Sequence, residues 1–140
     1  MFSFMKKLSR NKIIKKLDWV FSEYIRLRDS NSKWIVECPL CWKRIYWKYA
    51  QNMHFVSRWV LKYRFSEKNC HAGCMRCNVI LHWNYIEYTR FMQRKYWFEF
   101  VESIVRDKAP YKVSTPDLIS MIYNYEVKRN LLLKQKNLEL

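Results

Sequence analysis

Apolar residues recur at helical spacing in three stretches of the chain. Between residues 13 and 28 they lie three or four positions apart, so they fall on one face of a helix. The polar run at residues 29–32 ends this helix. A second pattern starts near Cys74 and predicts one long helix, or two helices broken near Tyr96. The apolar positions of the first helix are Ile13, Leu17, Val20, Phe21, Tyr24 and Leu27.

The third helical stretch follows a connector at residues 107–114. Thr115 is a suitable N-cap and Pro116 suits the first position of a helix, so we expect the helix to start here and run to about Leu133. Gly73 is the only glycine in the sequence. Few flexible turns are therefore available, and long helices are favoured.

The segment between the first two helices has the character of short strands. Residues 33–37 are rich in β-branched and aromatic side chains and predict a strand that leads into Cys38. Hydrophobic side chains then alternate between residues 43 and 50, which predicts a second strand with one buried face. Residues 55–68 form a loop, with a brief extended piece near residues 62–65. The buried face of the second strand is formed by Ile45, Trp47 and Tyr49.

The chain is strongly basic, with 27 Lys and Arg residues against 12 Asp and Glu residues and a formal net charge of +15. Such a charge favours a polyanionic partner, first nucleic acid and second an acidic membrane surface. Hydrophobic residues make up 50% of the chain, enough for the folded core of one domain. No run of eighteen apolar residues is present, so we expect no membrane-spanning segment.

Residues 1–16 hold six basic residues and no acidic residue. They lack the apolar core and cleavage site of a secretory signal. A membrane-surface helix is one interpretation of this segment, and a DNA-facing arm is the preferred one. We therefore expect an intracellular protein, in which thiols stay reduced and cysteines serve metal binding or packing.

Two Cys-x-x-Cys pairs stand out, Cys38 with Cys41 and Cys74 with Cys77. Two intervening residues allow a tight turn that places both sulfurs about 2.3 Å from one ion. A single pair would equally suit buried free cysteines, but two pairs favour a structural Zn²⁺ site that joins a β-hairpin to a helix. Cys70 is left over; packing is its preferred role, and competition as a ligand is the alternative.

Two asparagines and three histidines accompany the cysteine pairs. Hydrolysis of a phosphodiester needs a base for water, which His54 suits, and a group such as Asn69 to hold the imidazole. Asn78 and His82 are four residues apart, so on a helix they would bind a catalytic cation from one face. We expect Mg²⁺ or Mn²⁺, although an imidazole ligand also admits Ni²⁺ or Zn²⁺. His71 is left as a phosphate contact, a support for the catalytic residues or a helix cap.

This order of cysteines, histidine and asparagine is typical of the HNH nucleases, in which a ββα element binds one divalent cation. From about residue 17 to residue 133 the sequence also resembles the phage recombination endonucleases called NinG or Rap. The motifs that carry this resemblance are Leu17-Asp18, residues 21–29, Cys38-x-x-Cys41, His54-Phe55 with Arg58, Arg64-Phe65, residues 69–72, Cys74-x-x-Cys77-Asn78, Asn84, Glu87-Tyr88 and residues 115–118.

The resemblance implies a phage-encoded DNA endonuclease that acts in the host cytoplasm. Its substrates would be branched recombination intermediates such as D-loops and Holliday-like junctions, and it would act as a homodimer. Many HNH enzymes carry an Asp or His ligand immediately before the base, where this chain has Met53. Either the cation is held by Asn78, His82, phosphate and water, or this copy of the enzyme is weakened or inactive.

Basic and aromatic residues are interleaved between residues 43 and 68. Basic side chains would contact phosphates, and exposed rings would stack on unpaired bases. Arg58 is the preferred phosphate clamp because it follows His54 by four residues in the same loop. No helix resembles a base-reading element, so we expect recognition by shape. The candidate DNA-binding residues are Arg58, Arg64, Lys62, Lys48, Arg44 and His71.

Together these features predict an α+β fold in a single domain of residues 1–140. Its core would be a zinc-knuckle, treble-clef-like ββα His-Me finger at residues 33–90, between a basic N-terminal helix (1–32) and C-terminal helices (91–140). A structure-selective endonuclease is the preferred function. The alternatives are a degenerate zinc-knuckle module that binds branched or single-stranded DNA without cutting, and a basic regulator or packaging factor folded by zinc.

Overall fold

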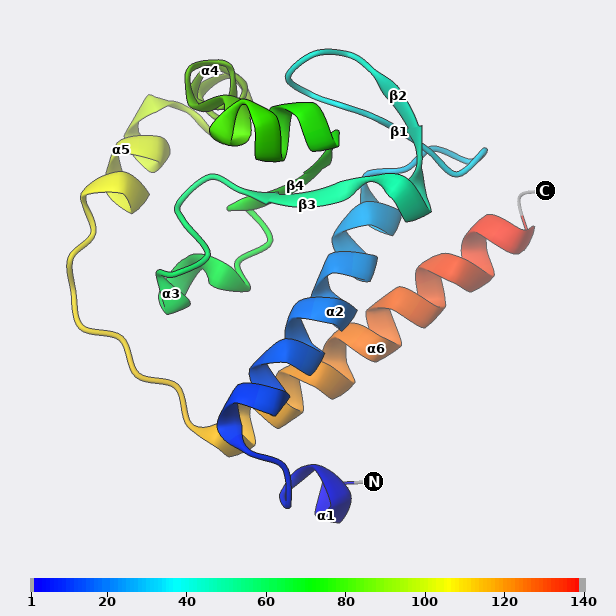
Figure 1. Cartoon of the computed structure of the whole chain (residues 1–140), viewed down its shortest axis with the longest axis vertical. Helices are drawn as coiled ribbons and strands as arrows, with labels where there is room; N and C mark the ends of the chain where they lie inside the picture. Colours follow the sequence, from blue (N-terminus) through cyan, green and yellow to red (C-terminus); the bar gives the residue numbers. More distant parts are fainter. Residues whose placement is uncertain (1, 139–140) are drawn as a thin grey trace.

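The two longest elements of the computed structural model, which describes residues 2–138, are the helices α2 (Arg10–Arg28) and α6 (Thr115–Leu138) (Figure 1). Helix α2 is the first predicted helix, and it begins three residues before the predicted start at residue 13. Ser9 caps its start, because the Ser9 hydroxyl accepts a hydrogen bond from the Lys12 N–H at 3.3 Å. The short helix α1 (Phe2–Met5) precedes it.

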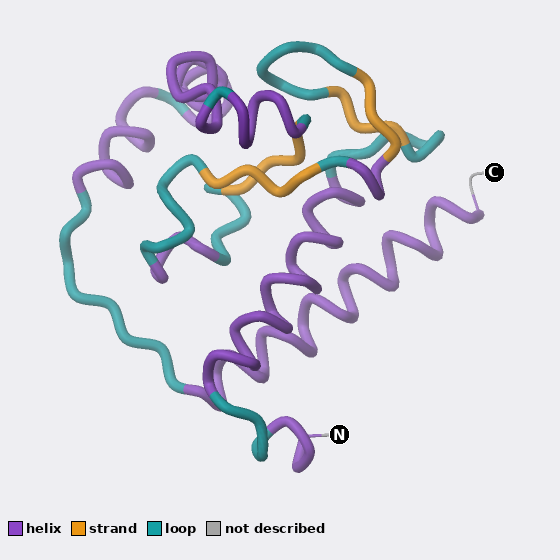
Figure 2. The backbone as a smooth tube through the Cα atoms, viewed as in Figure 1, coloured by secondary structure: helices purple, strands orange, loops and turns teal. Residues whose placement is uncertain are grey.

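Helices α2 and α6 lie side by side and run in the same direction (Figure 1). At their starts, Arg10 donates a hydrogen bond to Thr115 Oγ1 at 3.1 Å, and near their ends Lys136 donates to the Ser30 carbonyl at 2.8 Å. A long connector without regular structure brings the chain back to the start of α6 (Figure 2). The parallel arrangement depends on this connector, because two helices joined by a short turn would run in opposite directions.

The start of α6 differs by one residue from the prediction. Ser114 is the cap, since its hydroxyl accepts a hydrogen bond from the Asp117 N–H at 3.1 Å. Thr115 is then the first helical residue and Pro116 the second, where a missing N–H is still tolerated. The helix also continues past Leu133 to Leu138.

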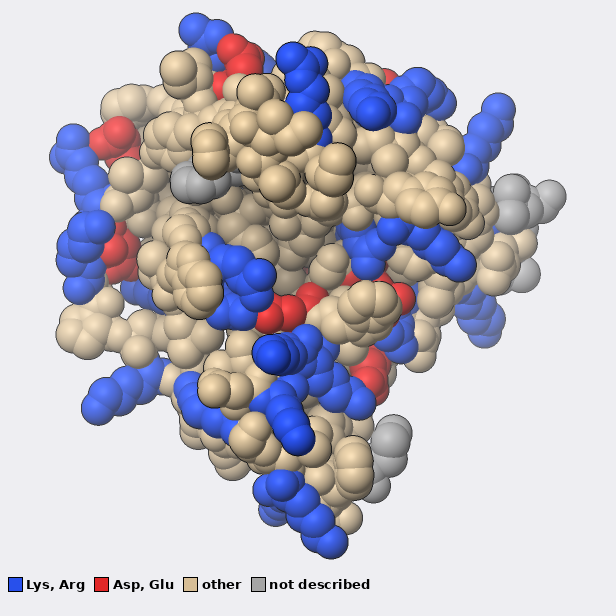
Figure 3. Space-filling model, in the orientation of Figure 1, with Lys and Arg blue, Asp and Glu red and all other residues tan. Residues whose placement is uncertain are grey.

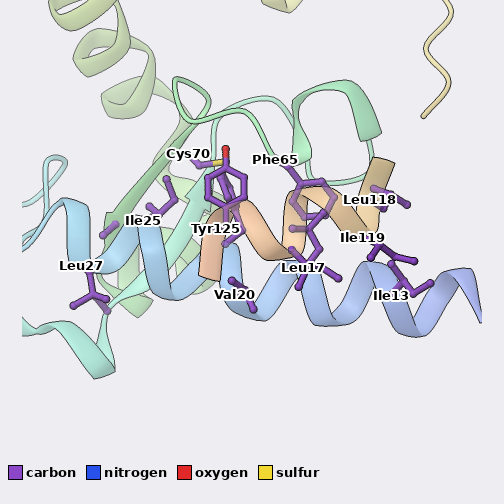
Figure 4. Packing of buried hydrophobic residues seen from close by; sticks show 14 of the residues in the cluster. Ile13, Leu17, Val20, Ile25, Leu27, Phe65, Cys70, Leu118, Ile119 and Tyr125 are labelled. Carbon is purple, nitrogen blue, oxygen red and sulfur yellow. The ribbon is translucent and has the colours of Figure 1, made fainter. Parts of the chain in front are cut away.

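A first hydrophobic cluster fills the space between α2, α6 and the strands above them (Figure 4). Every apolar position predicted for the first helix is buried in it except Tyr24, which packs at its edge. We call this the helix-side cluster; its fully or nearly buried members are Met5, Ile13, Leu17, Val20, Phe21, Ile25, Leu27, Val36, Trp47, Ala50, Phe65, Cys70, Ala72, Leu118, Ile119, Ile122 and Tyr125.

Two small antiparallel sheets lie at the end of α2. Strands β1 (Ile35–Glu37) and β2 (Arg44–Tyr46) form the first, with Val36 opposite Ile45. Strands β3 (Gln51–His54) and β4 (Cys70–Gly73) form the second, with Met53 opposite His71 and His54 opposite Cys70. Helices with small antiparallel sheets make the fold α+β, as predicted.

Of the strand predicted at residues 43–50, only Arg44–Tyr46 is a strand in the structure. After β2 the chain enters the 3₁₀ turn η1 (Trp47–Tyr49), in which the Trp47 N–H donates to the Trp34 carbonyl at 2.9 Å. Trp47 is buried, but Tyr49, expected on the same buried face, is 77% exposed. A turn no longer alternates its side chains as a strand does, so the prediction for Tyr49 was wrong.

The loop at residues 55–68 contains a helical turn instead of the extended piece predicted near residues 62–65. This turn is α3 (Leu61–Arg64). The N–H groups of Tyr63 and Arg64 both donate to the Val60 carbonyl, at 3.0 and 3.1 Å. The turn shortens the loop and directs the Arg64 carbonyl back toward the β3–β4 hairpin.

The helical pattern predicted from Cys74 onward is interrupted twice. It starts with the π-helical turn η2 (Arg76–Ile80) and the 3₁₀ turn η3 (His82–Asn84), and only then becomes α4 (Tyr85–Tyr96). Trp97, at φ 70°, separates α4 from α5 (Phe98–Arg106), which confirms the predicted break near Tyr96. These elements enclose a second hydrophobic cluster, which we call the zinc-side cluster: Cys38, Leu40, Met53, Phe55, Cys74, Cys77, Tyr88, Met92, Val101 and Ile104.

Basic side chains outnumber acidic ones on the visible surface (Figure 3). Figure 3 shows Lys and Arg distributed over one face of the molecule, with the fewer acidic side chains among them. Of the helices in the described part of the chain, none combines the length and the apolar content that crossing a membrane requires.

Candidate functional site

The four predicted cysteine ligands meet at one point. Cys38 and Cys41 lie in the turn between β1 and β2, and Cys74 and Cys77 follow β4. Their four sulfur atoms all lie within 4.8 Å of one another. A tetrahedral ion with metal–sulfur bonds of about 2.3 Å places its ligands roughly 3.8 Å apart, so the cluster fits a metal ion such as zinc.

Neighbouring groups support thiolate ligands at this cluster. Asn84 Nδ2 donates to Cys77 Sγ at 3.7 Å, and the Cys77 N–H donates to Cys74 Sγ at 3.4 Å. Such donors hold metal-bound sulfurs in place. Cys70 lies outside the cluster, fully buried on the helix side, with its thiol 3.6 Å from the Arg64 carbonyl. Its expected packing role is therefore confirmed.

His54, the predicted general base, ends strand β3 and is fixed by one hydrogen bond. Its Nε2 lies 2.9 Å from the Arg64 carbonyl oxygen. A carbonyl can only accept, so Nε2 must carry the proton and Nδ1 keeps its lone pair. Burial lowers the pKa of His54 below its ordinary value; the hydrogen bond to Arg64 opposes this, and the charge of Arg58 adds to it. The imidazole is therefore neutral near pH 7.

Asn69, predicted to hold this imidazole, does so indirectly. Its amide is buried, accepts a hydrogen bond from the Val56 N–H at 2.7 Å, and donates to the carbonyls of Val56 and Tyr63 at 3.0 and 3.1 Å. These bonds close the loop between β3 and β4. The carbonyl of Arg64, next to Tyr63, then orients His54, so the expected direct contact is replaced by a backbone one.

Strand alternation separates Met53 from the residues on either side of it. Asn52 and His54 both line two adjoining cavities of about 330 and 280 Å³. Met53 is fully buried on the opposite face, where a Cβ added to Gly73 would overlap its thioether and lie 3.3 Å from Cys38 Sγ. Met53 therefore packs behind the cysteine cluster and does not occupy a ligand position in the cavities.

The predicted pairing of Asn78 with His82 rests on regular helical spacing that the chain does not have. Asn78 lies in the π-helical turn and lines both cavities. His82 lies in the next turn with φ 49°, is exposed, and lines neither cavity. Asn52 takes its place beside Asn78, and its Oδ1 is buried without a hydrogen-bond partner among the described residues. Asn52 was missed because nothing in the sequence marks it apart from its position two residues before His54.

Asp18 is a second residue of the site to which the sequence analysis assigned no role. It lines the larger cavity from α2 and binds both arginines: Arg58 at 3.0 Å, and Arg64 through Nε at 2.9 Å and through a terminal nitrogen at 2.5 Å. The pairing holds the two guanidinium groups beside His54. Its signal in the sequence was the Leu17-Asp18 motif of the family resemblance, which marked the position without indicating its partners.

The remaining candidate DNA-binding residues are spread over the molecule. Lys62 is engaged in an ion pair with Asp107 at 2.5 Å. Arg44 and Lys48 are exposed near β2 and η1, where Arg44 lies 3.9 Å from Glu37 and Lys48 lies over the Trp47 ring. None of the three lines either cavity.

The prediction that His71 contacts DNA was wrong. It is 1% exposed, and its two ring nitrogens lie 2.9 Å from the hydroxyls of Tyr88 and Tyr96. Tyr88 donates to the Met53 carbonyl at 2.9 Å, so it accepts from Nδ1–H of His71, and Tyr96 donates to Nε2. His71 thus joins α4 to the hairpin as a neutral residue.

This network makes the stability of the protein depend on pH. Burial, with the nearby charges of Arg28 and Lys95, lowers the pKa of His71 from 6.5 to about 2. The unfolded chain takes up a proton near pH 6.5 and the folded chain does not, so this stability is complete above pH 6.5 and declines as the pH falls toward 2. Between pH 7 and pH 5.5, we expect His71 to lower the free energy of unfolding of the wild type by about 1 kcal/mol. The variant His71→Phe should not show this loss.

The measurement is urea unfolding at both pH values. His82→Ala is the control, because His82 is an exposed histidine outside the contacts that His71 makes with Tyr88 and Tyr96. Equal pH dependence in wild type and His71→Phe would show that His71 is not held neutral.

Comparison with known proteins supports the resemblance that the cysteine and histidine motifs suggested. Residues 4–136 match the family described as bacteriophage lambda NinG protein. Neither the curated proteins nor the solved structures contain a match. Since the family match covers nearly the whole chain, including the cysteine cluster and both cavities, the chain belongs to the bacteriophage lambda NinG protein family.

Proposed function

We propose that this chain is a metal-dependent endonuclease that cuts branched recombination DNA with His54 as its general base. The observation that carries the proposal is the hydrogen bond between His54 Nε2 and the Arg64 carbonyl, at the wall of a polar cavity. It fixes the tautomer in which Nδ1 can accept a proton. Together with the lowered pKa, it gives the neutral imidazole that deprotonation of water needs near pH 7.

The local order of elements supports a ββα His-Me finger. Strands β3 and β4 form a hairpin, and the chain continues through the turns η2 and η3 into α4. The cysteine cluster joins the end of this hairpin to the β1–β2 turn. A site held on a hairpin and a metal cluster is more rigid than a site on loops alone, which a positioned base requires.

Asn52 and Asn78 are the proposed ligands of the catalytic cation. Asn78 Nδ2 donates to Gln51 Oε1 at 2.8 Å, which fixes the amide and leaves its Oδ1 for a ligand bond. Asn52 Oδ1 is buried without a hydrogen-bond partner in the described part of the chain. Amide oxygens suit Mg²⁺ or Mn²⁺, which would complete its coordination with phosphate oxygens and water. The cation would supply charge stabilisation at the phosphate being cleaved.

Charge and family membership support the choice of substrate. The net charge of +15 favours nucleic acid, and Arg58, held by Asp18 at the cavity, is the proposed clamp for the phosphate next to the one being cut. Membership of a phage family points to a recombination-related role in the infected cell. Branched DNA, two strands of which must be cut, accounts for the proposed homodimer.

The test is cleavage of a labelled four-way junction and a linear duplex of the same sequence. Reactions with Mg²⁺, with Mn²⁺ and with no added divalent ion separate the catalytic cation from structural zinc. We expect ion-dependent nicking of the junction and little cutting of the duplex. Tight junction binding without cutting under any ion would instead establish the non-cutting binding module, and equal, weak binding of both DNAs would contradict either function.

A further inference from the structure

Trp59 is an exposed aromatic side chain at the wall of the proposed active site. It is 84% exposed, more than any other large apolar side chain whose exposure is described. It lines the smaller cavity together with Asn52, His54, Arg58 and Asn78. A single exposed aromatic residue on a protein surface is ordinary, but one that shares a cavity with the proposed base and cation ligands has a chemical context.

The backbone holds Trp59 in place on both sides. In the turn before it, the Ser57 hydroxyl accepts a hydrogen bond from the Trp59 N–H at 3.3 Å, and the Ser57 carbonyl accepts from the Val60 N–H at 2.9 Å. Helix α3 follows directly, and Asn69 clamps the loop at Val56. The indole is therefore presented by an ordered turn and needs little ordering when a ligand arrives, which favours binding.

The neighbour of Trp59 indicates what this ligand would be. The Arg58 guanidinium lies over one face of the Trp59 ring, 5.9 Å from its centre, and 3.0 Å from Asp18, so a cation borders an indole whose remaining surface is exposed. A nucleotide likewise combines an anionic phosphate and a flat aromatic base in one unit, so it could meet the cation and the indole together. In a continuous duplex both faces of each base are covered by neighbouring bases, so only an unpaired base offers a face to an indole.

We propose that Trp59 selects the substrate of this site by stacking on a nucleobase that lies unpaired next to the scissile phosphate, while Arg58 binds that nucleotide's phosphate. The inference deepens the proposed function and rests on it for the position of the scissile phosphate. It gives a physical reason for a preference for branched, gapped or single-stranded DNA over duplex, since only the former supplies the base.

The experiment measures binding without cleavage, so it does not depend on nuclease activity. The probe is a duplex with one unpaired 2-aminopurine, compared with the same duplex in which the 2-aminopurine is paired, with no added divalent ion. Stacking on an aromatic ring quenches 2-aminopurine fluorescence. We expect wild type to quench the unpaired probe, and Trp59→Ala to lose the quenching and bind that probe about 5- to 100-fold more weakly.

Two further variants make the result specific. Trp59→Phe keeps a flat ring and should retain most of the quenching. Trp97→Ala removes another exposed tryptophan, 74% exposed between α4 and α5 and outside both cavities, and should bind both probes as wild type does.

Three outcomes would overturn the proposal. They are unchanged quenching in Trp59→Ala, an equal loss of affinity for paired and unpaired probes, and a change from dimer to monomer in sedimentation, which would assign the indole to a contact between two copies of the chain. Failure of the proposed nuclease would show differently, as absence of junction cleavage while the tryptophan-dependent quenching persists.

Discussion

His54→Ala is expected to reduce metal-dependent cleavage of a four-way junction by about 10²- to 10⁴-fold, the contribution of a positioned general base. The imidazole is held by the Arg64 carbonyl at 2.9 Å with Nδ1 free to accept a proton, and of the described residues that line both cavities only His54 can accept a proton near pH 7. Junction binding should change little, because the phosphate contacts assigned to Arg58 remain. Single-turnover cleavage and binding, measured on the same labelled junction, separate the two effects.

The pH profile gives a second readout of the same residue. Burial lowers the pKa of His54, so the rate should rise with pH through a midpoint below 6.5 and then stay level. His82→Ala is the matched control, since His82 is exposed outside the cavities and should cleave at the wild-type rate. Unchanged cleavage in His54→Ala would refute its assignment, and loss of cleavage in His82→Ala would return the cation to the Asn78–His82 pair.

Removal of the metal is expected to unfold the zinc-side cluster. Structural zinc contributes about 10–16 kcal/mol in small zinc-dependent folds, as much as the whole stability of an ordinary domain of about 5–15 kcal/mol. Here the proposed ligands Cys38, Cys74 and Cys77 are themselves members of the zinc-side cluster, so its packing depends on them directly. A strong zinc chelator, or Cys77→Ser, should abolish amide protection in α4 and release one zinc ion per chain.

Cys70→Ala is the control for this experiment. Cys70 is as buried as Cys77 but belongs to the helix-side cluster and lies outside the four-cysteine group. Its loss leaves only a small void, so the protein should keep its zinc and its α4 protection. A chain that remains fully folded after complete zinc removal would refute a structural role for the cysteine cluster.

Local patterns in the sequence were sufficient for the parts of the fold that depend on local spacing. The period of the apolar residues gave α2 and its buried face, because an isolated amphipathic pattern is decided within a few turns of helix. The two Cys-x-x-Cys pairs predicted a four-sulfur cluster, because each pair is a local turn. Both predictions needed no knowledge of distant contacts.

His71 shows where such reasoning fails. Its sequence neighbours suggested a loop near DNA, yet its partners Tyr88 and Tyr96 lie 17 and 25 residues further along the chain. Only the packing of α4 on the hairpin brings them together. A histidine in a basic segment cannot be told from a buried one without those contacts.

The predicted pairing of Asn78 with His82 was wrong because of the backbone conformation. Residues 75–96 contain no glycine or proline, so they predict continuous helix, but His82 and Asn84 adopt φ of 49° and 45° and end the turns there. Non-glycine residues rarely adopt this conformation, although asparagine does so more readily than most. Asp18 and Asn52 received no role for different reasons. Asp18 is far from His54 in sequence, and Asn52 is marked only by its position two residues before His54 on a strand.

The pairing of α2 with α6 sets the order in which the chain can fold. Arg129 binds Glu23 at 2.9 Å across 106 residues of sequence, so α2 leaves the ribosome long before its partner helix exists. The hairpin, the zinc cluster and α4 have only shorter separations to close and can form first. The part of the apolar face of α2 that α6 covers stays open to water or to chaperones until the last fifth of the chain is made, since contacts distant in sequence are slow to form. A nascent chain stalled before residue 115 would therefore expose the part of that face that α6 covers, and newly made protein would complete its core only after its final helix has docked.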